Sequence, residues 1–217
     1  MENTFRLLDE KSDLDVSMTI DASLKKIVSL IGIEKYSLHL TDLDVSHNHI
    51  TNLGPLRFMK SLEILNISYN INLKSLEGIE NSFSLKQLHM VKCNVSSLQH
   101  LRKCVKLSHI GFSFNSVTNF DGLQHCVNLN SLSCSSNNGL NSIKGLPNKT
   151  INVSIFDTPL DHIYSTGEGN MNFGGCPYWN FGEKSGTNSF EILKTLDDST
   201  YFSWIYVNDL SKLYDFF

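Results

Sequence analysis

The chain has 217 residues and a formal net charge of −4, with 41% hydrophobic and 18% charged residues. This is the composition of a globular protein with a low charge content. The net charge predicts no strong attraction to nucleic acid or to an anionic membrane. The sequence contains no run of about 18 apolar residues, so no membrane-spanning helix is predicted.

The amino-terminal residues, MENTFRLLDEKSDLD, are polar and acidic, and no basic region followed by an apolar stretch is found there. We therefore expect no secretory signal and an intracellular, cytoplasmic protein. The five cysteines are Cys93, Cys104, Cys126, Cys134 and Cys176. Their odd number favours reduced thiols over a disulfide framework. A Cys104–Cys126 disulfide is the alternative, because the two residues occupy the same position one repeat apart.

The first predicted element resembles a later part of the chain. Residues 13–19, DLDVSMT, share five identical residues with DLDVSHN at 42–48, and the two copies lie 29 residues apart. Apolar residues between Ser23 and Ile33 have helical spacing, and Ser23 is a suitable N-cap. The sequence therefore predicts a divergent first repeat followed by a short helix.

Five segments between residues 40 and 140 share one pattern, with apolar residues at the first, fourth and sixth places and Asn or Cys at the ninth. Their first residues are spaced by 22, 23, 22 and 22 residues: Leu40, Leu62, Leu85, Leu107 and Leu129. A weaker copy, TINVSIFDTPL, follows at 150–160 with Thr158 at the ninth place. This fixed period indicates a solenoid, in which each repeat buries its apolar face against its neighbours.

The pattern L-x-x-L-x-L-x-x-N/C-x-L resembles that of leucine-rich-repeat proteins. The resemblance covers about residues 11–163, and the period is similar to that of intracellular phosphatase regulators and bacterial internalins. It implies an α/β solenoid: a leucine-rich-repeat horseshoe with a concave parallel β-sheet, short helical or 3-10 turns on the convex side, and a non-repeat C-terminal cap. We assign residues 1–39 to an N-terminal cap and divergent first repeat, 40–163 to the leucine-rich repeats, and 164–217 to an aromatic-rich C-terminal cap or extension.

Side chains in the short strand of each repeat alternate between the core and the concave face. Leu43 and Val45 are expected to point inward, and Asp42, Asp44 and Ser46 outward. The residue at the ninth place turns the chain out of the strand. Four of these residues are asparagines that are expected to hydrogen-bond the loop backbone, namely Asn48, Asn70, Asn115 and Asn137.

The carboxy-terminal quarter lies outside the repeat pattern. Residues 165–189 are rich in Gly, Asn and Ser and predict a long loop, whereas residues 200–210 predict a strand. Thirteen of the 22 aromatic residues occur from Tyr164 onward. This density favours a cap on the last repeat. A binding hot spot around Tyr178 and Trp179 is the alternative.

The sequence gives no support for catalysis. The run GEGNMNFGG at 167–175 lacks the G-K-[ST] ending of a phosphate-binding loop. His89 and His109 should both project from the concave face, but no zinc-type ligand spacing accompanies them. We therefore predict no catalytic residue, no metal and no cofactor.

The concave face is the candidate surface for a protein partner. Its amino end is acidic, with Asp13 and Asp15 of the weak first repeat beside Asp42 and Asp44, and it suits a basic partner. The predicted partner-binding residues are Asp42, Asp44, Glu63, Asn66, Tyr69, His89, Lys92, His109, Phe114, Tyr178 and Trp179. The aromatic residues at the eighth place, Tyr69 and Phe114, are exposed anchors unless they pack on a neighbouring loop.

Together these features predict a non-catalytic adaptor that binds a partner protein and neither nucleic acid nor membrane. Two alternatives stay open. One is an enzyme or enzyme subunit with a site in the Gly- and aromatic-rich carboxy-terminal segment. The other is a structural subunit that self-associates through an exposed end strand. The sequence leaves the oligomeric state open.

Overall fold

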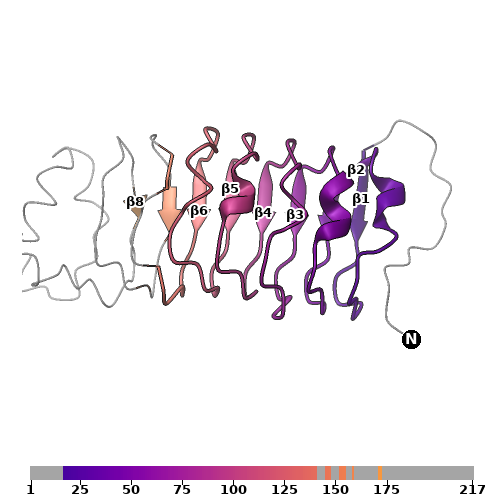
Figure 1. Cartoon of the computed structure of the whole chain (residues 1–217), viewed down its shortest axis with the longest axis horizontal. Helices are drawn as coiled ribbons and strands as arrows, with labels where there is room; N and C mark the ends of the chain where they lie inside the picture. The colour runs from indigo at the N-terminus through magenta and orange to yellow at the C-terminus, as the bar shows by residue number, and fades with distance from the viewer. Residues whose placement is uncertain (1–16, 141–144, 148–151, 155–157, 159–170, 173–217) are drawn as a thin grey trace, which may run out of the picture.

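The computed structural model describes residues 17–140, 145–147, 152–154, 158 and 171–172. Within them, parallel strands stand side by side in chain order and form one eight-stranded sheet (Figure 1). The strands are β1 (Met18–Asp21), β2 (Leu40–Asp44), β3 (Ile64–Asn66), β4 (Gln87–His89), β5 (His109–Gly111), β6 (Ser131–Ser133), β7 (Asn152–Ser154) and β8 (Met171–Asn172). No helix among the described residues is long and apolar enough to cross a membrane.

The strand register follows the fourth place of the repeat pattern. Leu43 pairs with Leu65, Leu65 with Leu88, and Leu88 with Ile110. All four side chains are buried in a single core that runs the length of the described solenoid. The register continues to β7, where Val153 pairs with Leu132. The predicted leucine-rich-repeat solenoid with a parallel sheet is therefore confirmed.

The return path of each repeat runs along the convex side in turns of three residues. In the second repeat, Leu53, Leu56 and Met59 are buried. The Leu56 N–H donates to the Leu53 carbonyl and the Met59 N–H to the Leu56 carbonyl, at 2.8 and 2.9 Å. A 3-10 helix has three residues per turn, so apolar residues at every third position face the core. Three such helices are present in the described part: η1 (Ile33–Tyr36), η2 (Gly54–Phe58) and η3 (Gln99–Leu101). The predicted 3-10 turns are confirmed.

The amino end differs from the prediction. The strand that pairs with β2 is β1, with Ile20 opposite Leu43, so the first repeat lies 23 residues away and not 29. Residues 23–32 form no helix, and Leu24 and Lys26 adopt left-handed φ values of 57° and 58°. The reason is that this segment is an ordinary return path, with buried Ile27, Leu30 and Ile33 spaced by three. The predicted helix over 23–33 was wrong.

The asparagine at the ninth place joins each repeat to the one before it. Asn48 accepts hydrogen bonds from the backbone N–H groups of Lys25 and Ile27 at 3.0 and 2.9 Å. Its amide donates to the carbonyls of Ala22 and Val45, both at 2.9 Å. The Asn48 side chain therefore supplies hydrogen-bond partners to backbone groups of two repeats, most of them buried. Asn70, Asn115 and Asn137 repeat this arrangement.

The two exceptions, Cys93 and Thr158, each follow a repeat whose loop is one residue longer. In those repeats the buried leucine comes three residues after the asparagine, and its N–H donates to the carbonyl of that asparagine. These bonds are Leu73 to Asn70 and Leu140 to Asn137, both 2.9 Å. The next repeat then needs no side-chain acceptor, so a cysteine or a threonine fits. Both Cys93 and Thr158 are buried.

Two smaller predictions also need correction. Ser46 was expected to point outward, but it is buried, as are Ser68 and Ser113 at the same place. The hydroxyl oxygens of Ser68 and Ser113 accept the N–H of Val91 and Ser135 in the next repeat, both at 3.1 Å, which explains their burial. The loop predicted over 165–189 contains β8, which extends the sheet by pairing with β7. The cap predicted for 164–217 otherwise lies outside the described residues.

Candidate protein-binding face

The open face of the sheet carries most of the predicted partner-binding residues. Asp42, Asp44, Asn66, His89 and His109 lie in strands β2 to β5, with side chains on the side away from the core, and all are exposed or half-buried. Glu63 directly precedes β3. Tyr69, Lys92 and Phe114 follow the strands at the eighth place. Tyr178 and Trp179, and also Asp13 and Asp15, lie outside the described residues.

An acidic patch, formed by Asp21, Asp42, Asp44 and Glu63, occupies the amino end of this face. Asp44 accepts a hydrogen bond from the Asn66 amide at 2.8 Å. Glu63 forms an ion pair with Lys86 at 2.7 Å, so part of the predicted negative charge is neutralised. Asp21 takes the place predicted for Asp15. Hydrogen bonds from Ser23 lower the pKa of Asp21, with a further contribution from Lys25, so this carboxylate is ionised at neutral pH.

A second feature is the row of side chains at the eighth place, which we call the trailing row: His47, Tyr69, Lys92 and Phe114. The rings of His47 and Tyr69 stack with centroids 4.1 Å apart. The Lys92 ammonium lies 5.7 Å from the Tyr69 centroid, within range of a cation–π interaction. Tyr69 is nevertheless 40% exposed and Phe114 is 56% exposed. Both rings therefore remain accessible. Tyr69 lies in the repeat next to Asp44, and Phe114 lies two repeats further along.

Every residue of the trailing row has a left-handed backbone. The φ values lie between 54° and 60° for His47, Tyr69, Lys92 and Phe114, and Leu24 and Ser136 share the conformation at the same place. Because it recurs in every described repeat up to β6, it belongs to the turn and is not strain at a special site. Asparagine adopts this conformation more easily than an aromatic residue. The aromatic side chains are therefore not explained by the turn.

The middle of the open face is a shallow polar area. His89 and His109 lie on neighbouring strands, and the Nδ1 atom of His109 is 2.9 Å from the Ser108 hydroxyl. Gly111 stands opposite His89 and leaves space where other repeats carry a side chain. No cluster of three metal-ligating side chains occurs among the described residues. The open face is therefore better suited to contact with the surface of another molecule than to holding a metal ion.

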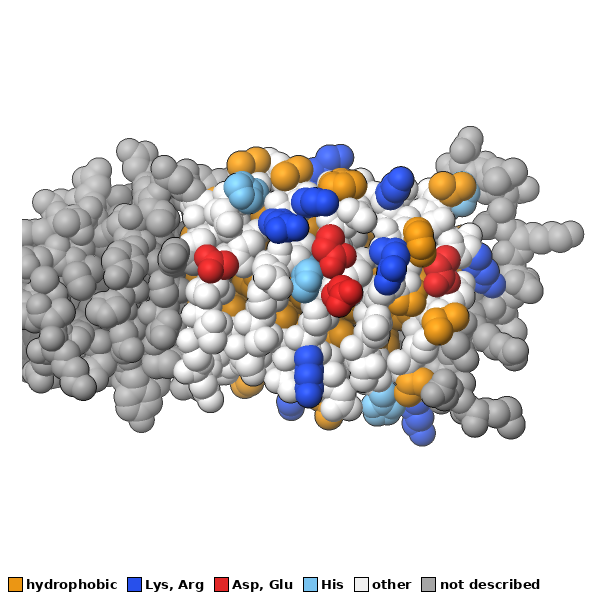
Figure 2. All heavy atoms as spheres, in the orientation of Figure 1, with side chains coloured by type: hydrophobic (Ala, Val, Ile, Leu, Met, Phe, Trp, Pro, Cys, Tyr) orange, Lys and Arg blue, Asp and Glu red, His pale blue; other side chains and the backbone are white. Residues whose placement is uncertain are grey.

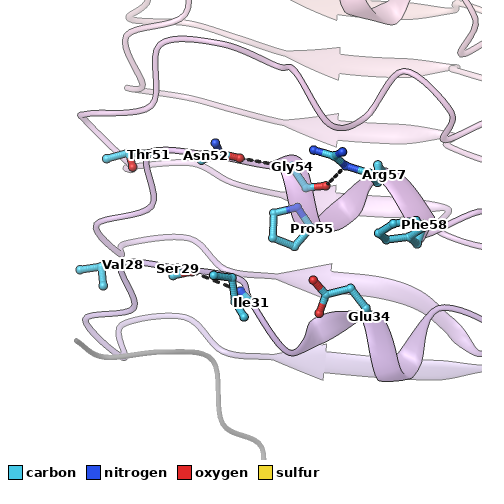
Figure 3. A pocket seen from close by; sticks show the side chains of 10 residues that line it. All are labelled: Val28, Ser29, Ile31, Glu34, Thr51, Asn52, Gly54, Pro55, Arg57 and Phe58. Carbon is cyan, nitrogen blue, oxygen red and sulfur yellow. Dashed lines mark hydrogen bonds between the residues drawn. The ribbon is translucent and has the colours of Figure 1, made fainter. Parts of the chain in front are cut away.

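A hollow with a volume of about 460 Å³ lies on the convex side between η1 and η2 (Figure 3). Its apolar lining includes Ile31 and Phe58, both exposed. Its polar groups serve the fold, since the Glu34 carboxylate accepts the Gly32 N–H at 2.7 Å and Arg57 donates to the Gly54 carbonyl at 2.7 Å. The hollow therefore offers no set of poised reactive groups.

The cysteines of the described part belong to the core. Cys93, Cys104, Cys126 and Cys134 are free thiols and are buried. Burial raises the pKa of Cys104 to about 12, with further contributions from Cys126 and Glu80, and raises the pKa of Cys126 to about 11. These thiols are protonated at neutral pH, so they are poor nucleophiles. The alternative of a Cys104–Cys126 disulfide is not realised.

The parallel sheet, the 3-10 return paths and the row of ninth-place asparagines, which we call the asparagine ladder, define a leucine-rich-repeat solenoid. A family model described as Leucine Rich repeats (2 copies) matches residues 39–81. The crystal structure of internalin C2 from Listeria monocytogenes is similar over 64% of this chain and 66% of that chain, at 16% sequence identity and a TM-score of 0.51. A second Listeria monocytogenes internalin, inlF, matches over 73% of this chain and 54% of that chain, at 17% identity and a TM-score of 0.47.

No curated protein matches the sequence. The match spans just under two thirds of the length of internalin C2 and about half of the second internalin. At this level of identity the likeness to internalin C2 establishes the fold and nothing of its activity or partners.

The sequence did not single out three residues that shape this face: His47, Lys86 and Asp21. His47 and Lys86 occupy the same repeat places as Tyr69 and Glu63, so the register alone could have pointed to both contacts. Asp21 was missed because the first repeat was placed too early in the chain. Of the predicted residues, the structure brings together Asp44 with Asn66 and Tyr69 with Lys92.

Proposed function

We propose that this protein is a non-catalytic interaction module that binds a partner protein on the open face of its sheet. The observation that carries the proposal is the trailing row beside the acidic patch. Large aromatic side chains that stay exposed in a solenoid contribute binding energy when a partner covers them. Solenoids of this kind present an extended surface that suits a protein better than a small molecule.

The partner surface that fits best is basic with exposed apolar groups. Asp21, Asp42 and Asp44 attract positive charge, and the Asn66 amide holds the Asp44 carboxylate in place. Tyr69 and Phe114 supply the apolar contacts at the trailing edge of the same face. Opposite charges speed association and select the partner, whereas aromatic burial slows dissociation. We propose that both are needed.

We also propose that the protein works inside the cell. Three of its buried thiols have a pKa raised to about 11 or 12 and carry no disulfide. Reduced cysteines of this kind are common in intracellular proteins. A denaturing thiol titration of protein isolated without reductant tests this part, with five free thiols expected for the five cysteines. Fewer than five would contradict it.

The binding proposal is tested by affinity capture with the full chain and two matched variants, followed by mass spectrometry. Phe114→Asn removes an exposed ring and keeps a residue that tolerates the left-handed turn. Val127→Asn makes the same kind of change at an exposed apolar residue on the other edge of the sheet and is the control. A partner retained by the native chain and the control but lost by Phe114→Asn supports the proposal. Equal capture by all three chains would contradict it.

The electrostatic part is tested with the double variant Asp42→Asn, Asp44→Asn. Both substitutions keep the size of the side chain and remove its charge. We expect capture of the same partner to fall by about tenfold at low salt and to become less sensitive to salt. Unchanged salt sensitivity would show that the acidic patch takes no part.

A further inference from the structure

The edge at which the strands begin has a composition unlike the rest of the surface. We call it the leading edge and define it by the loops that precede β2 to β6: residues 35–39, 58–61, 81–84, 103–106 and 125–128. These loops contain four lysines and no aspartate or glutamate, although the whole chain has a net charge of −4. The leading edge is therefore a local basic surface on an acidic protein.

The same loops expose large apolar side chains. Leu38 is 78% exposed and Val127 is 63% exposed, and Phe58, Phe83 and Val105 are each about half exposed. Half of the ten large apolar residues that are exposed in the described part belong to these loops. Figure 2 shows hydrophobic and Lys or Arg side chains together along the upper edge of this view, with no Asp or Glu among them.

The repeat register places these side chains at the same position of successive repeats. Leu38, Phe83, Val105 and Val127 each stand two residues before the first leucine of the next repeat, and Lys60 fills the same place in the second loop. Neighbouring strands lie about 4.8 Å apart, so the row is about 20 Å long. These exposed side chains therefore line one edge of the sheet.

The net charge of the whole chain predicted no strong attraction to an anionic membrane, but the four lysines are concentrated at one edge. We propose that the leading edge docks the protein on an anionic lipid surface. Apolar side chains alternating with lysines are the composition of interfacial membrane-binding segments, in which the apolar groups enter the headgroup region and the lysines meet anionic lipids. A second copy of the chain fits poorly, because its leading edge would bring lysines against lysines. The proposal goes beyond the partner-binding function, which uses the opposite edge and the open face.

Co-sedimentation of the full chain with vesicles tests this assignment. Vesicles of phosphatidylcholine with about one third phosphatidylserine are compared with vesicles of phosphatidylcholine alone. We expect binding to the anionic vesicles that weakens as salt rises, and little binding to the neutral ones. The proposal would be overturned if the chain sedimented equally with both vesicle types, or if it bound neither type.

Variants locate the contact. Lys103→Glu with Lys106→Glu should lower binding to anionic vesicles by about tenfold or more, because two attractive charges become repulsive. Val105→Ser with Val127→Ser should also lower it, since the apolar contribution is lost. Lys25→Glu with Lys74→Glu reverses two exposed lysines outside the leading edge and should leave binding within about twofold. Thermal midpoints confirm that each variant is folded.

Two outcomes separate this proposal from its nearest alternatives. If Lys103→Glu with Lys106→Glu binds vesicles as well as the native chain, the leading edge is not the contact and the proposal fails. If the native chain ignores vesicles but binds polyglutamate through these lysines, the ligand is an acidic protein surface and the lipid assignment is overturned. Phe114→Asn should bind vesicles normally, so a failure here is distinct from a failure of the partner-binding proposal.

Discussion

The two edges of the sheet satisfy their backbone hydrogen bonds in different ways. The strands begin at the leading edge and end at the trailing edge. At the trailing edge, asparagine side chains at the ninth place accept and donate the hydrogen bonds that the backbone lacks. At the leading edge, the backbone closes its own three-residue turns, as in Cys104 N–H to Leu101 carbonyl and Leu107 N–H to Cys104 carbonyl, at 2.8 and 2.9 Å. The ninth place is therefore an asparagine where a backbone N–H of the preceding repeat lacks a partner, whereas the buried leading-edge position accepts small or apolar residues.

Stability and surface chemistry are therefore determined by different positions of the repeat. The ninth place and the leading-edge interior decide the free energy of unfolding. The eighth place and the exposed positions of the leading-edge loops are free to vary, because their side chains do not pack in the core. Unusual residues at exposed places are consequently the ones that point to function.

The largest expected effect is at the trailing edge. Asn48 is 2% exposed, and its amide and carbonyl bond to five backbone groups in two repeats. Asn48→Ala should lower the free energy of unfolding by roughly 3 kcal/mol, since several buried backbone groups lose their partners. Urea denaturation measures the loss. Asn94→Ala, at the exposed tenth place, is the control and should cost less than about 0.5 kcal/mol.

The next effect concerns the thiols of the leading-edge interior. Burial raises the pKa of Cys104 from 9.0 to about 12 and of Cys126 to about 11. Above pH 9 the unfolded chain releases these protons and the folded chain keeps them, so the free energy of unfolding falls as pH rises. Each thiol contributes at most about 1.4 kcal/mol per pH unit until its folded-state pKa is reached.

This alkaline loss is measured as urea midpoints at pH 7.5 to 10.5, a range of about three pH units that spans the ionisation of an ordinary thiol. Cys104→Ala should show a shallower decline than the native chain between pH 9 and 10.5, because one group with a raised pKa is gone. Parallel declines for the two proteins would show that Cys104 is not shielded from solvent in the way that the fold requires.

A smaller effect is expected at Ser82, which occupies the same leading-edge position as Met59, Cys104 and Cys126. Ser82 is buried, and its hydroxyl has no hydrogen-bond partner within the described residues. Folding removes the Ser82 hydroxyl from water without giving it a hydrogen bond, and this costs free energy. Ser82→Ala removes that cost and should stabilise the fold by about 1 kcal/mol. A lower thermal midpoint for the variant would indicate a partner for this hydroxyl.

The smallest effect sharpens the rule for the ninth place. Cys93 follows a loop whose Leu73 N–H is already bonded to the Asn70 carbonyl. An asparagine side chain at residue 93 would find no N–H at that position, so Cys93→Asn should not stabilise the protein and should cost about 1 kcal/mol. A clear gain in stability would mean that loop length does not decide the ninth residue.

The sequence was sufficient for most of the fold. The spacing of leucines such as Leu65 and Leu88 gave the register of β3 to β6, because side-chain alternation leaves one way to bury them. It was insufficient at the amino end. There the identity of 13–16 to 42–45 was given more weight than the three-residue spacing of Ile27, Leu30 and Ile33, which matches that of Ile50, Leu53 and Leu56.

The candidate site was predicted only in part. Alternation placed Asp42, Asp44 and His89 on the open face correctly, since it depends on backbone geometry alone. The contacts across repeats were not predicted. Stacking of His47 on Tyr69 and pairing of Glu63 with Lys86 depend on rotamers that a repeat pattern does not specify.

The adjacent residues Phe114 and Asn115 test the central claim most directly, because one is an exposed member of the trailing row and the other a member of the ladder. Urea midpoints and partner capture are measured for Phe114→Asn and for Asn115→Ala. We predict that Phe114→Asn keeps its midpoint and loses the partner. Asn115→Ala should lose roughly 1–2 kcal/mol and retain the partner while folded. Loss of stability without loss of binding in Phe114→Asn would contradict the assignment of the trailing row to partner recognition.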